Sequence, residues 1–240
     1  SFATRSVGAL NQPRWFGQAV LLPTGQVMLF SGSDVDEVVG PGSETPVLEP
    51  ELYDPATETW SVMATQGRPR TYHNSAVLLP DGRVLVGGHS IIPTFYALHM
   101  DVPMRGPGGR DATFEIFSPP YVFAPRPVIT SAPAQAAPGD TLTVVTPNAA
   151  AVVNGGHAVL VRRTALTHLV DGDQRNVVLP IVRSDGESLT LRVPSNDAAQ
   201  NQAVLPPGHY LLFIVVKDGD RLVPSESAPV LITGADLSCR

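Results

Sequence analysis

The stretch Ala19-Val20-Leu21-Leu22-Pro23-Thr24-Gly25-Gln26-Val27 returns 57 residues later as Ala76-Val77-Leu78-Leu79-Pro80-Asp81-Gly82-Arg83-Val84. In each copy a Pro-x-Gly turn separates two short apolar runs, which is the pattern of a β-hairpin. A repeat of about 50 residues built from such hairpins is typical of a β-propeller blade of the kelch type. Because a propeller closes with roughly four to eight blades, we expect a missing N-terminal propeller fragment or other chains to complete the ring.

A second pair of matching segments extends each unit and reveals an insertion. Glu51-Leu52-Tyr53-Asp54-Pro55 matches Glu115-Ile116-Phe117-Ser118-Pro119 at an offset of 64, so the second unit carries seven extra residues. They lie in the loop from His89 to Asp111, and long loops on a propeller are where binding surfaces usually lie. The loop contains His89 and His99, but two histidines in one loop have no imposed geometry, so we expect no metal there.

The second half of the chain has the strand spacing of a β-sandwich. The proline-rich segment Ala124-Pro125-Arg126-Pro127 reads as an extended linker. Hairpin turns are predicted at Asn154-Gly155, Asp185-Gly186 and Asp218-Gly219. We therefore predict an all-β protein, with about two propeller blades in residues 1–123 and an immunoglobulin-like sandwich in residues 124–240. The apolar runs that carry the second prediction are Leu142–Val145, Ala158–Val161, Val177–Val182, Leu189–Val193, Tyr210–Val216 and Val230–Ile232.

Composition excludes several classes of protein. The 240 residues carry a formal net charge of −6, and we see no Lys/Arg cluster that would track a nucleic-acid backbone. No run approaches 18 consecutive apolar residues, so we expect no membrane span. The 24 prolines, 21 glycines and few charged residues suit a secreted all-β protein. The single cysteine, Cys239, cannot form an internal disulfide.

The candidate chemical residues are few. Tyr72 and His73 stand just before the second copy of the repeat. Adjacent strand residues point to opposite faces unless they lie at the start of the strand or in a bulge, and at the innermost edge of a blade both could reach the propeller axis. His168 precedes a turn-rich segment, so we place its imidazole on or near a hairpin tip, from which it could project into a neighbour.

These residues resemble a known family. The segment from Arg70 to Val84, with Gly87-Gly88 behind it, resembles the part of galactose oxidase and glyoxal oxidase that supplies an axial tyrosine and a copper histidine. The second half resembles the C-terminal early-set immunoglobulin-like domain of that family. Within it, residues 164–175 resemble the hairpin that inserts a second histidine into the propeller channel. The resemblance runs from about residue 13 to about residue 232.

The resemblance implies a C-terminal portion of a copper radical oxidase. His73 and His168 would be equatorial ligands of one copper ion, and Tyr72 the axial phenol that accepts a proton from the substrate. The implied substrate is a small alcohol, aldehyde or carbohydrate, which O2 oxidises to give H2O2. The radical tyrosine and its cross-linked cysteine are expected only in a missing N-terminal part. Nothing here can be assigned as that pair, neither Cys239 nor the remaining tyrosines, Tyr53, Tyr96, Tyr121 and Tyr210.

Two other functions stay open at this point. The chain could be a non-catalytic propeller and sandwich module that binds carbohydrate or protein, and copper binding would separate that hypothesis from the oxidase. It could also be a structural assembly module, because unpaired strand edges invite pairing with other chains. A mass that depends on concentration would favour this last hypothesis.

Overall fold

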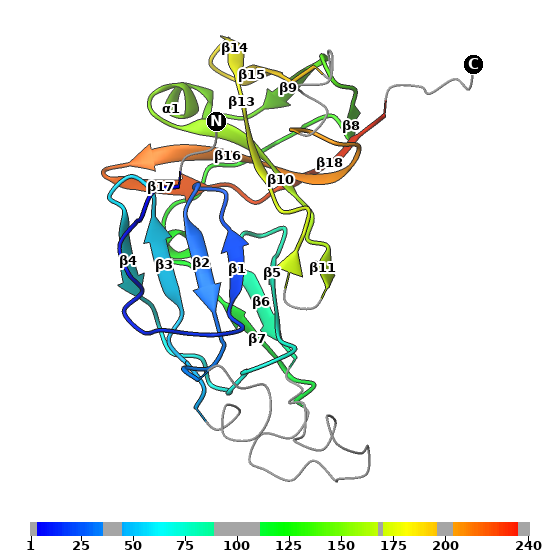
Figure 1. Ribbon diagram of the computed structural model, residues 1–240. Coiled ribbons are helices and arrows are strands. Elements are labelled where there is room, and N and C mark those ends of the chain that lie inside the picture. Colours follow the sequence, from blue (N-terminus) through cyan, green and yellow to red (C-terminus); the bar gives the residue numbers. More distant parts are fainter. Residues whose placement is uncertain (1–3, 36–44, 89–110, 168–169, 196–203, 235–240) are drawn as a thin grey trace, which may run out of the picture. The chain divides into compact units, whose positions relative to one another are not determined.

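The computed structural model describes residues 4–35, 45–88, 111–167, 170–195 and 204–234 (Figure 1). Its regular structure is almost entirely β-strand, which confirms the predicted fold class. In the part of the chain that is described, no helix combines the length and apolar character needed to cross a membrane. The chain divides into two compact units, the first comprising residues 1–78, 84–117 and 165–172, and the second residues 79–83, 118–164 and 173–240.

The first copy of the repeat folds into a four-stranded antiparallel sheet in the first unit. The strands follow chain order, as the blue to cyan ribbons of Figure 1 show. The Pro-x-Gly turn closes the first hairpin, where the Gly25 amide donates to the carbonyl oxygen of Leu22 at 2.9 Å. Gly25 has φ 85°, which glycine adopts without steric cost. The strands are β1 (Gln18–Leu21), β2 (Val27–Phe30), β3 (Glu51–Asp54) and β4 (Thr59–Val62).

The second copy forms a similar antiparallel sheet. It comprises β5 (Ser75–Leu78), β6 (Val84–Gly87) and β7 (Phe114–Phe117), and among the described residues it has three strands where the first sheet has four. Phe30 of β2 packs edge to face on Phe117 of β7, with ring centroids 5.4 Å apart. The two repeat copies therefore build two sheets that pack against each other, as expected of neighbouring blades.

The second unit is a two-layer sandwich, as predicted. One sheet has the strand order β14-β15-β9, and the other has the order β13-β10-β16-β18-β8, with β17 paired to β16. A short helix α1 (Ala149–Val153) and a 3-10 turn η3 (Pro120–Phe123) are the helical elements that the described residues contain. The strands are β8 (Gln135–Ala136), β9 (Thr141–Val145), β10 (His157–Arg162), β13 (Asn176–Leu179), β14 (Ile181–Ser184), β15 (Ser188–Arg192), β16 (Gly208–Asp218), β17 (Arg221–Pro224) and β18 (Ala228–Ile232).

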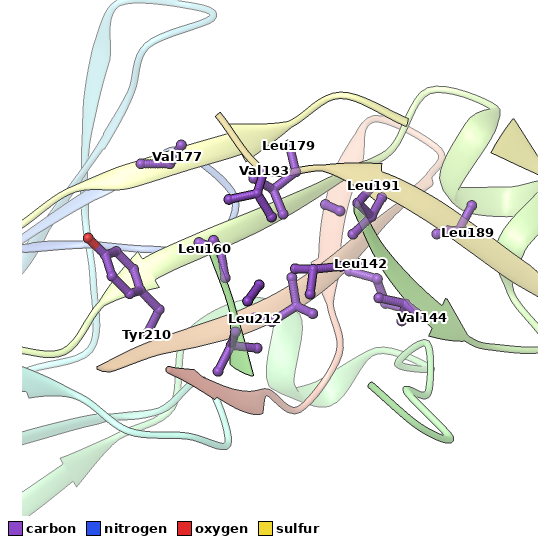
Figure 2. Close-up of a cluster of buried hydrophobic side chains, with 14 of the residues drawn as sticks. Leu142, Val144, Leu160, Val177, Leu179, Leu189, Leu191, Val193, Tyr210 and Leu212 are labelled. Carbon is purple, nitrogen blue, oxygen red and sulfur yellow. The ribbon is translucent and has the colours of Figure 1, made fainter. Parts of the chain in front are cut away.

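The sandwich core forms where the inner faces of its sheets meet. Figure 2 shows Leu142 and Leu191 from one sheet beside Leu160 and Leu212 from the other, all buried. Period-2 alternation explains this set, because every second residue of a strand points to the same face. β16 departs from alternation, since all its residues from Tyr210 to Val216 are buried. A continuous apolar run of this kind is typical of a strand covered on both faces.

Two details of the sandwich differ from the sequence prediction. The run Val177–Val182 is two strands, β13 and β14, which belong to different sheets. Pro180 separates them, and proline cannot donate a ladder hydrogen bond, so it suits a point where the chain changes sheets. Asn154-Gly155 does not join two strands but ends α1, where the Asn154 amide donates to the carbonyl oxygen of Ala150. The other two predicted turns join β14 to β15 and β16 to β17.

Arg126, within the predicted linker, donates to three carbonyl oxygens on two other backbone segments of the second unit. Its Nε donates to the carbonyl oxygen of Pro224 at 2.8 Å, one Nη donates to that of Asp81 at 2.7 Å, and the other donates to that of Ser225. Tyr121 adds a hydrogen bond from its hydroxyl to the carbonyl oxygen of Gly82. The predicted linker is therefore fixed by hydrogen bonds to its own unit.

Candidate metal centre

Tyr72 and His73 lie in a short turn that leads into β5. Their ring centroids are 4.1 Å apart and the ring planes are inclined by 37°. Neighbouring residues of a regular strand would point to opposite faces, but His73 has φ 49°, in the left-handed region. This backbone conformation lets both rings lie on one side of the chain. The turn thus brings a phenol and an imidazole together just before β5.

Phe16 is the aromatic neighbour of this pair. Its ring meets that of Tyr72 edge to face, with centroids 5.1 Å apart and planes inclined by 82°. An edge-to-face contact of this kind stabilises an aromatic pair by about 0.5–1.5 kcal/mol beyond the area it buries. Tyr72 is half-buried, whereas His73 is exposed. The phenol ring is therefore held in place, and the imidazole stays accessible from solvent.

His168 lies outside the described residues, but the hairpin that carries it is described. β11 (Leu166–Thr167) pairs antiparallel with β12 (Val170–Asp171), and Thr167 pairs with Val170. Residues 168 and 169 lie between these two strands in the sequence. The segment 165–172 belongs to the same compact unit as Tyr72 and His73, although its neighbours in sequence belong to the sandwich unit. The hairpin predicted from sequence is thus present, and it groups with the blades.

The donor set at the turn suits a metal ion that prefers nitrogen and oxygen ligands. The phenol of Tyr72 and the imidazole of His73 are such ligands, and in a tetragonal arrangement they favour Cu(II). Among the described residues, no group of three or more His, Cys, Asp or Glu side chains could hold a metal ion. Tyr72 and His73 are therefore the described residues that form the candidate centre.

The other described tyrosines have separate structural roles. Tyr53 packs against Trp60 with ring centroids 5.0 Å apart. Tyr210 donates from its hydroxyl to the carbonyl oxygen of Pro206 at 2.8 Å. Burial raises the pKa of the Tyr121 phenol, which keeps it a neutral hydrogen-bond donor. Four other residues named in the sequence analysis lie outside the described residues: His89, Tyr96, His99 and Cys239.

The remaining histidines lie elsewhere. His157 begins β10 and His209 lies on β16, both strands of the sandwich unit. Sequence reasoning missed two residues that border the Tyr72 and His73 turn, Arg70 and Asn74, both of which are buried. Their polarity gave no signal by itself, because most of their partners, such as Glu115 for Arg70 and Phe16 for Asn74, are distant along the chain.

Two family models together match most of the chain. The model described as "Glyoxal oxidase N-terminus" matches residues 4–121. The model described as "Galactose oxidase-like, Early set domain" matches residues 126–232. The first match contains the sheets β1–β4 and β5–β7 of the first unit, and the second contains the sandwich strands and the β11–β12 hairpin.

Individual relatives agree with these models. The chain is 30% identical over 227 residues to a galactose oxidase of Gibberella zeae, covering 92% of this chain and 29% of the relative. It is 30% identical over 212 residues to the aldehyde oxidase GLOX of Vitis pseudoreticulata, covering 84% of this chain and 39% of the relative. The chain thus spans about a third of the length of these relatives.

A solved structure has a similar fold. It is a fungal alcohol oxidase of the AA5 family, described as having catalytic diversity and determined in complex with copper. The TM-score is 0.78 at 27% sequence identity, and the match covers 96% of this chain and 44% of that chain. The likeness therefore includes both compact units described above.

Proposed function

The chain belongs to the galactose oxidase and glyoxal oxidase family, and from this premise we propose that it is the C-terminal portion of a copper radical oxidase. The observation that carries the proposal is the turn in which the rings of Tyr72 and His73 lie 4.1 Å apart. A primary alcohol and O2 would give an aldehyde and H2O2. An aldehyde, water and O2 would give a carboxylic acid and H2O2, so atoms and electrons balance in both reactions.

In this proposal His73 and His168 would hold the copper ion through imidazole nitrogens, and Tyr72 would bind it through its phenol oxygen. Copper, when bound, supplies one-electron redox chemistry that these side chains lack. The Tyr72 phenolate oxygen accepts the hydroxyl proton of the substrate. As a general base, this oxygen must lie within hydrogen-bond distance of the substrate hydroxyl. The edge-to-face contact with Phe16 restricts the orientation of the Tyr72 ring. The exposed side of His73 leaves room for ligands from solvent.

The rest of the cofactor and of the ring is proposed to come from an N-terminal part of the protein or from another chain. Two sheets are too few for a propeller, and the chain covers 29% of its galactose oxidase relative. The radical tyrosine and its cross-linked cysteine would belong to that part. Among the described residues β7 is the last strand of its sheet, where a further strand could pair, and Phe114 and Ile116 on one face of β7 are 65% and 50% exposed. We also propose that the blades end at residue 123 and that the sandwich begins at residue 124. A separate proposal is that the mature protein is secreted.

The test measures copper content and H2O2 release on the protein purified as its gene encodes it. We expect about one copper per chain and H2O2 formation with a primary alcohol or aldehyde, including a carbohydrate with a primary hydroxyl. Electron paramagnetic resonance should show Cu(II) with nitrogen hyperfine splitting. A folded protein that binds no copper would contradict the proposal and favour a carbohydrate- or protein-binding module, or an assembly module if its mass rises with concentration.

A further inference from the structure

Arg70 is buried at the start of the turn that carries Tyr72 and His73. Its side chain is 0% exposed, and its Nε and Nη2 donate to Oε2 of Glu115 at 3.2 and 3.1 Å. Nη2 also donates to Oγ1 of Thr113, and Nη1 donates to the carbonyl oxygen of Gly88, each at 3.2 Å. A buried guanidinium is costly unless it is paired and hydrogen-bonded. These four bonds meet that requirement and fasten the turn to β7 and to the end of β6.

Glu115 completes this attachment from the opposite side. While its Oε2 accepts from Arg70, its Oε1 accepts from the backbone amide of Gly67 at 2.6 Å. One carboxylate therefore holds both the Arg70 side chain and the backbone three residues before it. The segment that enters the turn is fixed at two points by a single residue of β7.

Asn74 closes the other end of the turn. Its Nδ2 donates to the carbonyl oxygen of Arg70 at 3.1 Å and to that of Phe16 at 3.2 Å. The same Arg70 carbonyl accepts from the Gly32 amide at 3.0 Å. One side-chain amide thus links the two ends of the turn and connects them to the backbone of the aromatic residue that contacts Tyr72.

The backbone enclosed by these bonds is strained. His73 has φ 49° and Phe16 has φ 60°, both in the left-handed region that residues with a Cβ rarely adopt. Such conformations persist where the surrounding structure determines them. Gly88 has φ 69°, and a Cβ at that position would lie 3.0 Å from the His73 carbonyl oxygen. The main chain of His73 is therefore confined on the side of β6 as well.

We propose that Arg70 and Asn74 are positioning residues that hold Tyr72 and His73 as a preformed pair of ligand donors. Without the bonds from Arg70 and Asn74, His73 would relax to an ordinary backbone conformation and its ring would leave Tyr72. This inference rests on the proposed copper site where its test measures the affinity for copper. Residues that orient metal ligands typically change metal affinity 10- to 100-fold when mutated.

The test compares Arg70→Lys and Asn74→Asp with Arg126→Lys, all in the protein as its gene encodes it. Lysine keeps the charge of Arg70 but cannot reach its three partner residues, and aspartate keeps the shape of Asn74 but loses both Nδ2 donors. Arg126→Lys loses a similar guanidinium fork in the sandwich unit. If Arg70→Lys does not fold, Glu115→Gln is used in its place. The side chain of Glu115 is 28% exposed.

Three quantities are measured in each variant: the melting temperature, the Cu(II) dissociation constant, and the ring-current shift of the His73 Cε1–H signal in metal-free protein. We expect Arg70→Lys and Asn74→Asp to weaken copper binding about 10- to 100-fold and to move the His73 signal toward its unstacked position. Arg126→Lys should lower the melting temperature and change neither of the other two quantities.

Unchanged copper affinity and an unchanged His73 signal in both variants would overturn the inference. The inference would also be overturned if Arg126→Lys changed the copper affinity and the His73 signal as much as Arg70→Lys and Asn74→Asp do, at the same loss of melting temperature. The effect would then be general destabilisation. If the parent protein binds no copper, the proposed function fails. The His73 signal of the metal-free variants then decides the positioning role by itself.

Discussion

Phe16 and His73 stand at equivalent positions of the two repeat copies, 57 residues apart, and both have left-handed backbone, with φ values of 60° and 49°. The same backbone conformation therefore precedes the first strand of both sheets. The first copy places Trp15 and Phe16 there, and the second places Tyr72 and His73. Both turns present two aromatic rings, but only the second presents groups that can bind a metal or accept a proton.

This equivalence suggests how to remove the imidazole without disturbing the turn. In His73→Phe the new side chain is the one found at the equivalent position of the first copy, so we expect a change in unfolding free energy within about 1 kcal/mol. Copper retention should be lost in His73→Phe and in His73→Ala, because a nitrogen ligand is missing in both. Metal analysis after dialysis checks this, and copper content equal to that of the parent would contradict the assignment of His73.

His168 should contribute the second imidazole. We expect His168→Ala to lose copper as fully as His73→Ala does, since a site with one histidine retains Cu(II) poorly. The matched control is His209→Ala, at an exposed histidine on β16 in the sandwich unit. The control should keep the copper content of the parent. If His168→Ala keeps it as well, the β11–β12 hairpin does not supply a ligand.

Tyr72 should matter for turnover more than for metal retention. Tyr72→Phe removes the proton acceptor but keeps the ring that makes the edge-to-face contact with Phe16. We expect the variant to retain copper and to lose at least about 100-fold in kcat, the lower range for a general acid or base. Steady-state H2O2 release and metal analysis of the same sample test this. Undiminished turnover would exclude Tyr72 as the proton acceptor.

The buried ion pair between Arg14 and Glu51 should make stability depend on pH. Both side chains are 1% exposed, with Arg14 Nη2 2.6 Å from Glu51 Oε1. Burial alone would raise the pKa of Glu51, but hydrogen bonds from Asn11, Gln12 and Arg14 outweigh it and lower that pKa below its ordinary value of 4.5. A carboxyl with a lowered pKa in the folded state stabilises the fold above its unfolded pKa. That stabilisation disappears as the pH falls through the folded pKa.

Glu51→Gln therefore gives a pH-dependent difference from the parent. At pH 7 the variant should lose about 3–5 kcal/mol of unfolding free energy, because the Arg14 guanidinium stays buried without its counter-charge. The difference should narrow as the pH falls below about 4.5, because the carboxyl of the unfolded parent is protonated there, and it should vanish once the pH is below the lowered pKa of the folded state. Urea unfolding of metal-free protein measures it. Glu58→Gln breaks an exposed pair with Arg5 and should cost less than about 1 kcal/mol at every pH.

The sandwich core should tolerate little loss of volume. Leu212 is fully buried on β16 among the side chains drawn in Figure 2. Leu212→Ala should lower the unfolding free energy by about 2–5 kcal/mol, because the truncated side chain leaves a cavity. Val178→Ala, at a residue that is 59% exposed on β13, should change it by less than about 0.5 kcal/mol. Similar losses in both variants would contradict the described core.

The features that were predictable from sequence are those that depend on residues close together in the chain. The repeated Pro-x-Gly turns indicated the β1–β2 and β5–β6 hairpins, and alternation indicated β15. The adjacency of Tyr72 and His73 indicated the candidate centre. The support of that centre was not predictable, because Glu115 and Arg70 meet across 45 positions of chain. Period-2 patterns also do not say to which sheet a strand belongs, which is why the sequence predicts a single apolar run over residues 177–182 where the structure has β13 and β14.

β16 has a consequence for how the protein is synthesised. It lies at the centre of the six-stranded sheet, between β10 and β18, and also pairs with β17. Yet it follows β8 to β15 along the chain, so a ribosome makes the centre of this sheet after most of its periphery. Until residue 218 has emerged, β10 can pair only with β13, and its other edge is open. The nascent sandwich should therefore depend on chaperones during this interval, and a translational pause before Gly208 should increase its aggregation.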